Sequence, residues 1–266
     1  MADVSGENAP EISSASEIYD TIVIGAGLSG LSAARELVKM GKHVLVLEAK
    51  DRVGGRTYTI EDEGLMWDLG GQWVATSQPH IMRTLEELGI ETYPQYIEGN
   101  KVMQTKDGKV TVYSDEGFGN LPLGWRDVGS LLQTILRIEL VSRQISSINP
   151  AAHGAKYDIH TVAGISDQWC GSSRARELVD VVLRVCMGTE SSLVSALYFL
   201  AYCRGTGGLA ALCEARNGGG QELRIKGGAQ QISEKLAASL GPSGVRFATP
   251  VVAVEQVWGE GCAMTW

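Results

Sequence analysis

The sequence lacks a long hydrophobic run. Its most apolar stretch, residues 193–203, is far shorter than the roughly 20 residues that a membrane-spanning helix needs. Residues 1–18 contain neither an apolar core nor an arginine, so they are typical of neither a signal peptide nor a transit peptide. We therefore predict a disordered tail over 1–18 and no membrane segment, and we expect the chain as given to be soluble and cytoplasmic.

Metal-binding and disulfide patterns are missing too. The five cysteines are odd in number and widely spaced, no CxxC pair occurs, and only four histidines are present. Zinc sites require Cys and His at short, regular spacings. The sequence therefore predicts reduced thiols and no metal site.

Positive charge is scarce. The chain has 23 Lys and Arg against 31 Asp and Glu, a formal net charge of −8. This excess of acid argues against a nucleic-acid partner, because nucleic acids are polyanions. With 44% hydrophobic and 20% charged residues the composition is that of a globular protein, and 266 residues suffice for one large or two smaller domains.

Glycine is abundant, with 33 residues, and one cluster follows a β-branched run. Residues 21–24 lead into Gly-x-Gly-x-x-Gly at 25–30, and a helical pattern continues to Gly41. Strand, glycine turn and helix in this order form the dinucleotide-binding fingerprint. Gly25 permits the tight turn, Gly27 lets the backbone approach a pyrophosphate, and Gly30 allows the helix to pack close to the strand.

A second predicted strand strengthens this interpretation. Residues 43–48 are typical of a buried parallel strand, and Glu48 at its end can accept hydrogen bonds from a ribose. A lone glycine turn is often purely structural. Strand, helix, second strand and acid in register favour nucleotide binding.

Two further glycine pairs distinguish a flavin from a nicotinamide cofactor. Gly54-Gly55 lies between Arg52 and Arg56, and Asp68-Leu69-Gly70-Gly71-Gln72-Trp73 follows another predicted strand. Adjacent glycines let the backbone close over an extended cofactor. Arg56 can neutralise a phosphate or approach a flavin edge. Taken alone, either pair is also compatible with a surface turn.

The elements GAGLSG, LEAKDRVGGRTYT and DLGGQW resemble, in order and spacing, the flavin-dependent amine oxidases, in particular the monoamine oxidase branch. The resemblance implies an α/β fold, in which a Rossmann-like FAD-binding domain carries an inserted helical and β substrate domain. It implies FAD as the cofactor. With the glycines of the first turn, the FAD contacts would be Gly25, Gly27, Ser29, Gly30, Glu48, Ala49, Arg56, Gly70, Gly71, Gln72 and Val251.

The remaining pattern suggests how these domains alternate along the chain. We expect the first FAD-binding segment over 19–92, a partial substrate domain over 93–219 and a returning, incomplete FAD-binding segment over 220–266. Expected helices cover 78–89, 131–148, 162–169, 175–186, 193–203 and 230–240. Expected strands cover 91–97, 101–104, 109–113, 245–247 and 250–254, with a hairpin turn at Asp107-Gly108.

The stretches VSALYFLAY at 194–202 and NGGGQE at 217–222 also resemble monoamine oxidases. Carried over position by position, the resemblance implies a substrate-cavity wall at Val182, Val185, Cys186, Cys213 and Gln221. Ordinary helix packing is the alternative explanation for each apolar member. No catalytic residue is assigned. The chemistry that the resemblance implies needs no triad or general-base histidine, and the sequence offers none.

Residues 256–266 no longer resemble the family, whose members continue further. We therefore expect a chain truncated at its C-terminus. Its strand over 251–257 should lack one neighbour, and its substrate helices should be partly uncovered.

The resemblance implies oxidation of a primary or related amine by O₂ to an imine and aldehyde, with release of H₂O₂. Another flavin oxidase, such as a polyamine or amino-acid oxidase, stays open, as does a catalytically inactive product with partial nucleotide binding. A nicotinamide dehydrogenase is a distant alternative. For a full-length form the resemblance admits a homodimer and a mitochondrial outer-membrane location.

Overall fold

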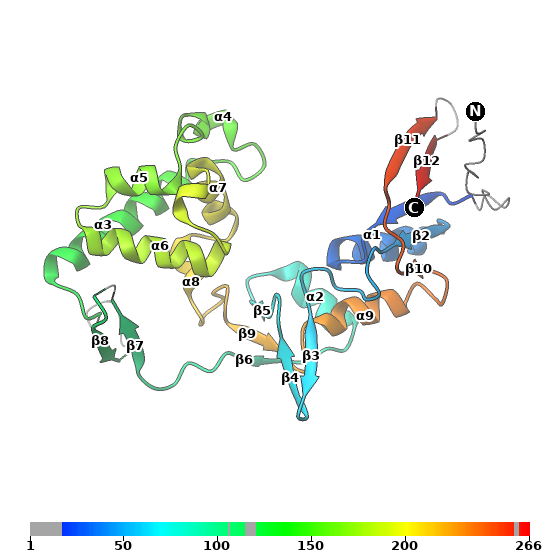
Figure 1. Ribbon diagram of the computed structural model, residues 1–266, viewed down its shortest axis with the longest axis horizontal. Helices are drawn as coiled ribbons and strands as arrows, with labels where there is room; N and C mark the ends of the chain where they lie inside the picture. The colour runs from blue at the N-terminus through cyan, green and yellow to red at the C-terminus, as the bar shows by residue number, and fades with distance from the viewer. Residues whose placement is uncertain (1–17, 106, 115–120, 258–260) are drawn as a thin grey trace, which may run out of the picture. The chain divides into compact units, whose positions relative to one another are not determined.

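The computed structural model describes residues 18–105, 107–114, 121–257 and 261–266. Contacts divide the chain into two compact units, one made of the segments up to Gly71 and Ala229–Trp266, the other of Gln72–Gly228 (Figure 1). The predicted tail, apart from Ile18, lies outside the described residues. The domain boundaries predicted at residues 92 and 219 separate FAD-binding segments from a substrate domain, and they stay predictions.

A three-stranded parallel sheet forms the centre of the first unit. Its order is β1 (Thr21–Ile24), β2 (Val44–Leu47) and β10 (Val245–Arg246), and every residue of the middle strand β2 is buried. Helix α1 (Leu28–Lys39) follows β1 and contacts β2, and α9 (Gln230–Ala238) packs against α1 (Figure 1). A buried central strand explains the uninterrupted apolar run. The predicted strand, glycine turn, helix and strand are confirmed.

Two antiparallel hairpins complete this unit. One pairs β3 (Thr59–Asp62) with β4 (Leu65–Asp68), and the other pairs β11 (Ala253–Val257) with β12 (Gly261–Thr265). The strand expected over 250–254 begins at Ala253: Pro250 has no N–H to give to a ladder, and the Val252 N–H donates to the Thr265 carbonyl at 2.9 Å just before the strand begins. Within the described residues β11 pairs with β12 alone, so its other edge has no strand partner, as predicted.

The second unit is mainly helical. Around one apolar core pack α3 (Trp125–Ser142), α5 (Val162–Trp169), α6 (Ser173–Met187), α7 (Ala196–Gly205) and α8 (Leu209–Cys213). Shorter helices cover Ala151–Gly154, Ala155–Tyr157 and Ser191–Leu193, and α2 (Pro79–Glu87) lies near the start of the unit. The hydroxyls of Thr161, Ser172 and Ser195 cap α5, α6 and α7.

Serine hydroxyls account for two of the wrongly predicted helix boundaries. The helix expected over 193–203 begins at Ala196, because Ser195 accepts a hydrogen bond from the Tyr198 N–H. The helix expected over 131–148 begins at Trp125 and ends at Ser142. Beyond that end, the Ser146 hydroxyl accepts hydrogen bonds from the N–H groups of residues 148 and 149 and replaces helical bonding there.

The strands of the second unit are short. One sheet has the antiparallel order β5 (Trp73–Val74), β9 (Leu223–Ile225) and β6 (Thr92–Pro94). A separate hairpin pairs β7 (Lys101–Gln104) with β8 (Val110–Tyr113). Its turn places Gly108 at a φ of 82°, and the Gly108 N–H donates to the Thr105 carbonyl at 2.8 Å. The predicted hairpin turn is confirmed.

Across the described ranges, no helix has both the length and the apolar character needed to cross a membrane.

Half-exposed leucines follow one face of α3, at Leu132, Leu136 and Leu140. The expectation of partly uncovered helices in this region is therefore confirmed.

Candidate functional site

The first glycine turn contains glycines with different structural roles. Gly25 has a φ of 97°, which favours glycine. A Cβ on Gly30 would overlap the Gly25 carbonyl oxygen and come within 3.2 Å of Val23 Cγ1. A Cβ on Gly27 would meet nothing within 4 Å. Gly30 is thus needed for close packing of α1 on β1, whereas the space beside Gly27 is open.

The N-terminus of α1 faces this open space without a side-chain cap. Gly27 is the N-cap residue, it provides no side-chain hydrogen bond, and the first turn contains no acid. The N–H groups of a first helical turn have no acceptor within the helix, and they carry a partial positive charge. This geometry suits a phosphate or another anion. Ser29 is exposed in the same turn.

The second glycine turn lies directly against the first. The Gly54 N–H donates to the Ala26 carbonyl at 2.9 Å, and Gly27 and Gly54 form a parallel β-bridge. A Cβ on Gly55 would stand 3.6 Å from the Gly27 Cα. Motifs that are separate in sequence therefore form one backbone surface.

The two arginines that flank this turn have different environments. The Arg52 guanidinium donates to the carbonyls of Val53, Gly55 and Thr57 at 3.1 to 3.2 Å, and it lies 4.3 Å from the centroid of the Tyr58 ring. Arg56 is exposed, and its side chain makes no hydrogen bond or ion pair with the described residues. Arg52 fixes the turn, and Arg56 is available to a ligand. Sequence reasoning singled out Arg56 and missed the role of Arg52.

The third glycine pair joins the same surface. The Gly71 N–H donates to the Arg56 carbonyl at 3.0 Å, and a Cβ on Gly70 would overlap that carbonyl oxygen. Gln72, the next predicted contact, is partly buried and begins the second unit. All three glycine motifs thus converge within the first unit.

Two polar side chains that the sequence analysis missed hold this arrangement to α9. Asp68 Oδ1 accepts hydrogen bonds from the Thr59 hydroxyl at 2.6 Å and from the Ala229 N–H at 2.9 Å. The buried Gln230 amide accepts from the Thr59 N–H at 2.9 Å and donates to the Val53 carbonyl at 3.3 Å. No local sequence signal identifies Gln230, because its partners lie more than 170 residues away.

Glu48 is buried, with 8% of its surface exposed, at the end of β2. Its Oε2 accepts a hydrogen bond from the Ala26 N–H at 2.7 Å, and its Oε1 accepts one from the Lys50 N–H at 2.9 Å. The carboxylate therefore ties the first glycine turn to the residues after β2. A carboxylate has about four acceptor positions, so capacity for a ribose hydroxyl is left.

The C-terminal segment around residue 248 also reaches the end of β2. The Ala248 N–H donates to the Lys50 carbonyl and the Thr249 N–H to the Glu48 carbonyl, each at 2.9 Å. Val251, two residues further on, is partly buried, and Ala49 is exposed. The structure thus brings the segment before Val251 beside the end of β2.

The second unit contains a cavity of about 340 Å³ lined by α3, α6, α7 and α8. Of the five predicted cavity residues, Val182 and Cys213 line it. Val185 is 64% exposed, and the Gln221 N–H donates to the Glu214 carbonyl at 3.1 Å. Cys186 is not in the lining, but its Sγ lies 4.0 Å from the Cys213 Sγ.

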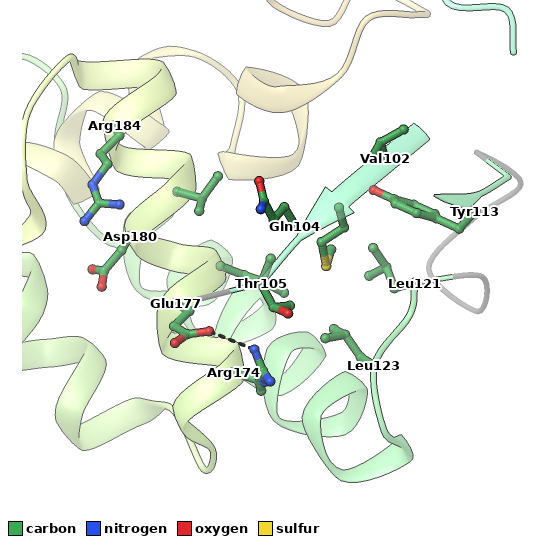
Figure 2. Close-up of a pocket in the computed structure, with 13 residues that line it drawn as sticks. Val102, Gln104, Thr105, Tyr113, Leu121, Leu123, Arg174, Glu177, Asp180 and Arg184 are labelled. Atoms are coloured by element: carbon green, nitrogen blue, oxygen red, sulfur yellow. Dashed lines mark hydrogen bonds and ion pairs between the residues drawn. The ribbon is translucent and has the colours of Figure 1, made fainter. Parts of the chain in front are cut away.

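A larger cavity of about 570 Å³ separates the β7–β8 hairpin from α6 (Figure 2). Charged side chains line its α6 side, where Arg174 Nη1 lies 3.4 Å from Glu177 Oε2. Tyr113, Leu121 and Leu123 lie on the opposite side in Figure 2. The sequence analysis predicted no part of this cavity, because its walls come from segments without a shared motif.

Glu222 ends the NGGGQE stretch and holds two loops together. Its Oε2 accepts from the Thr76 N–H at 2.8 Å and the Thr76 hydroxyl at 2.6 Å, and its Oε1 accepts from the Gly218 N–H at 3.0 Å. These hydrogen bonds, that of the Thr76 hydroxyl foremost, hold the pKa of Glu222 below its ordinary value. Glu222 thereby stabilises the loop that contains Gln221.

This lowered pKa predicts a pH-dependent contribution to stability. A carboxyl group whose pKa is lower in the folded state stabilises the fold above its unfolded pKa, about 4.3. The contribution is lost as the pH falls through the lower folded value. Glu222→Gln should therefore be less stable than wild type at pH 7, and the difference should shrink below about pH 4.

Urea unfolding at pH 7, 5, 4 and 3 measures this difference. Glu86→Gln, which replaces an exposed side chain on α2, is the matched control and should change the stability at pH 7 by less than about 0.5 kcal/mol. A Glu222→Gln difference that stays constant across this range would contradict the predicted linkage.

Comparison with known proteins identifies the family. A family model described as flavin containing amine oxidoreductase matches residues 28–265. The chain belongs to this family. The probable flavin-containing monoamine oxidase A of Dictyostelium discoideum is 37% identical over 243 residues, covering 91% of this chain and 52% of that protein. The flavin-containing amine oxidase B of Bos taurus is 35% identical over 242 residues, covering 89% and 45%.

A solved structure agrees with this family assignment. Wild-type putrescine oxidase bound to putrescine matches with a TM-score of 0.83 and 30% identity, covering 92% of this chain and 54% of that one. The chain thus spans about half the length of the relatives it matches. The monoamine oxidase-like character and the α/β fold with its insert are confirmed, and the flavin of this family is FAD.

One expectation is overturned by the family match. Residues 256–266 were expected to leave the family pattern, but the match continues to residue 265. In the structure Gly261–Thr265 of this segment form β12, which pairs with β11 and places Val254 opposite Met264. Short hairpin strands carry little sequence pattern of their own, which is why the resemblance was missed.

Proposed function

We propose that the first unit holds the ADP half of FAD and that the protein acts in FAD-dependent amine oxidation. The observation that carries this proposal is the convergence of three glycine motifs around the uncapped N-terminus of α1. The open space beside Gly27 fits a group that approaches the backbone closely. An anionic pyrophosphate suits the partial charge of the helix end.

Each predicted contact then has a role in binding. Gly25, Gly27, Ser29 and Gly30 would receive the pyrophosphate, and Glu48 with Ala49 would contact the ribose side. Val251 would meet the adenine. Arg56, which has no partner among the described residues, would approach a phosphate or the flavin together with Gly70, Gly71 and Gln72.

When bound, FAD supplies the redox chemistry by which a primary or related amine and O₂ give an imine, then an aldehyde, and H₂O₂. The chain's own residues would bind and orient the cofactor and the amine, and they would exclude water from the site. The cavity beside Val182 and Cys213 has a largely apolar wall, which favours the neutral form of an amine. We propose that it forms part of the amine site, together with Val185, Cys186 and Gln221.

A diamine or polyamine oxidase is the second candidate, supported by the structural likeness to putrescine oxidase. A peroxidase-coupled assay of the FAD-supplemented chain, with a monoamine and a diamine as substrates, distinguishes the two. Bound FAD without turnover of either amine would favour the third alternative, a nucleotide-binding product without catalysis. On the resemblance alone, we also propose homodimer assembly and a mitochondrial outer-membrane location for a longer form.

Glycine substitutions test the cofactor site directly. Gly27→Ala should fold normally, because the added Cβ meets no atom and the φ of −80° suits alanine. It should nevertheless weaken FAD binding about tenfold or more, since the methyl group enters the space proposed for the pyrophosphate. Gly30→Ala should instead destabilise the fold by about 1–3 kcal/mol through overpacking.

The measurements are FAD and ADP titrations followed by flavin fluorescence and by competition, with urea unfolding in parallel. Gly129→Ala in α3 is the control, because its Cβ also meets nothing and the change raises helix propensity. It should bind FAD like wild type. Undiminished FAD binding by Gly27→Ala would overturn the proposed site.

A further inference from the structure

Two cysteines of the second unit face each other across neighbouring helices. Cys186 lies in the last turn of α6, and Cys213 is the final residue of α8. Their Sγ atoms are 4.0 Å apart, although the residues are separated by 27 positions in the chain. The other three cysteines, all within the described residues, are free thiols without a thiol neighbour at this distance.

The local structure allows the two sulfurs to approach further. A disulfide needs an S–S distance of about 2.05 Å, so the pair must close by about 2 Å. Cys213 ends a helix of five residues, and the chain continues from it in an extended conformation at Glu214. The end of α8 can therefore shift toward α6 without breaking a long helix.

We propose that Cys186 and Cys213 form a peroxide-sensitive dithiol that closes to a disulfide between α6 and α8. The oxidant is hydrogen peroxide. The Cys186 thiolate attacks one peroxide oxygen, and the O–O bond breaks. The departing hydroxide is protonated and leaves as water, and Cys186 is then a sulfenic acid. Cys213 then attacks that sulfur, the S–O bond breaks, and a second water leaves. Two thiols and one H₂O₂ thus give one disulfide and two waters.

The environments of Cys186, Cys213, Cys203 and Cys170 support this order of events. The hydrogen bond with Cys213 lowers the pKa of Cys186, and that same interaction together with burial raises the pKa of Cys213. Burial raises the pKa of Cys203 to about 12 and also raises that of Cys170. Because the thiolate is the reactive form, Cys186 is the attacking residue.

The disulfide would act on the cavity described above. Cys213 lines the cavity of about 340 Å³, and Val182, one turn before Cys186 on α6, lines it too. A bond between α6 and α8 would hold these two walls together and restrict their movement. Peroxide from any source suffices, so the inference does not depend on the proposed amine oxidation.

Peptide mapping tests the proposal on the full reduced chain. The chain is treated with a few molar equivalents of H₂O₂, its remaining thiols are alkylated, and a proteolytic digest is analysed by mass spectrometry. The expected product has lost two hydrogen atoms and yields a peptide pair linked through Cys186 and Cys213. Cys170 and Cys203 should be recovered as alkylated thiols after denaturation.

Single variants separate the two roles. In Cys213→Ser, Cys186 should accumulate as a sulfenic acid that dimedone traps, whereas in Cys186→Ser, Cys213 should stay a thiol. Cys262→Ser, which removes an exposed thiol of the first unit, should form the same disulfide as wild type. Circular dichroism confirms that each variant folds. Oxidation of Cys262 before Cys186, or only intermolecular disulfides, would overturn the proposal.

Discussion

Replacement of Phe199 by alanine is expected to lower the free energy of unfolding of the second unit by about 3–5 kcal/mol. Phe199 is 0% exposed and belongs to the core where α3, α5, α6 and α7 meet. Its removal takes away the packing of a whole aromatic ring and enlarges the cavity of about 340 Å³ that this ring borders. Urea unfolding followed by far-ultraviolet circular dichroism measures the loss.

The neighbouring residue provides the matched control. Tyr198 precedes Phe199 on α7 and is 59% exposed, so Tyr198→Ala should cost less than about 1 kcal/mol. Because the chain consists of two units, each variant should be followed by a probe of each unit. Equal losses for the two substitutions would show that α7 does not pack as described.

The first unit was largely predictable, because its signals are local. The β-branched strand, the glycine spacing and the amphipathic helix occur within residues 21–41, and each has a direct structural cause. The docking of Gly54 on Ala26 was not predictable from spacing. Neither was the contrast between a bound Arg52 and an unpartnered Arg56, since both lie in the same motif.

The second unit shows a different limit. Helical periodicity located α5 and α6 well, but α3 extends from Trp125 to Ser142, not over 131–148. Periodicity reports the buried face of a helix, whereas its ends depend on caps and on hydrogen bonds such as those of Ser146. Boundaries therefore required the structure.

The candidate amine cavity was only partly accessible for a related reason. Resemblance transfers positions along the chain, and it placed Val182 and Cys213 in a cavity wall that the structure contains. It does not transfer packing: the Val185 side chain is 64% exposed in this chain, and its place in the amine site stays a prediction. The thiol pair of Cys186 and Cys213 became visible only when α6 and α8 were seen together.

Glu48→Ala is expected to have the second large effect, a loss of about 2–4 kcal/mol in the free energy of unfolding of the first unit. The substitution removes both hydrogen bonds of the carboxylate. The buried Ala26 N–H is then left unpaired, whereas the exposed Lys50 can turn to water. The unpaired Ala26 N–H should therefore account for most of the loss of stability. Asp51→Ala, an exposed acid three residues on, should leave stability nearly unchanged.

Glu48→Gln separates the structural role of this residue from its proposed role in binding. The glutamine carbonyl oxygen can keep the bond to Ala26, but its NH₂ group then faces the Lys50 N–H and cannot accept from it. Stability should fall less than in Glu48→Ala. If the carboxylate also accepts a ribose hydroxyl, ADP affinity should fall about tenfold or more while most of the stability is retained. If ADP affinity falls no further than the loss of stability explains, Glu48 holds the glycine turn and has no role in binding the ribose.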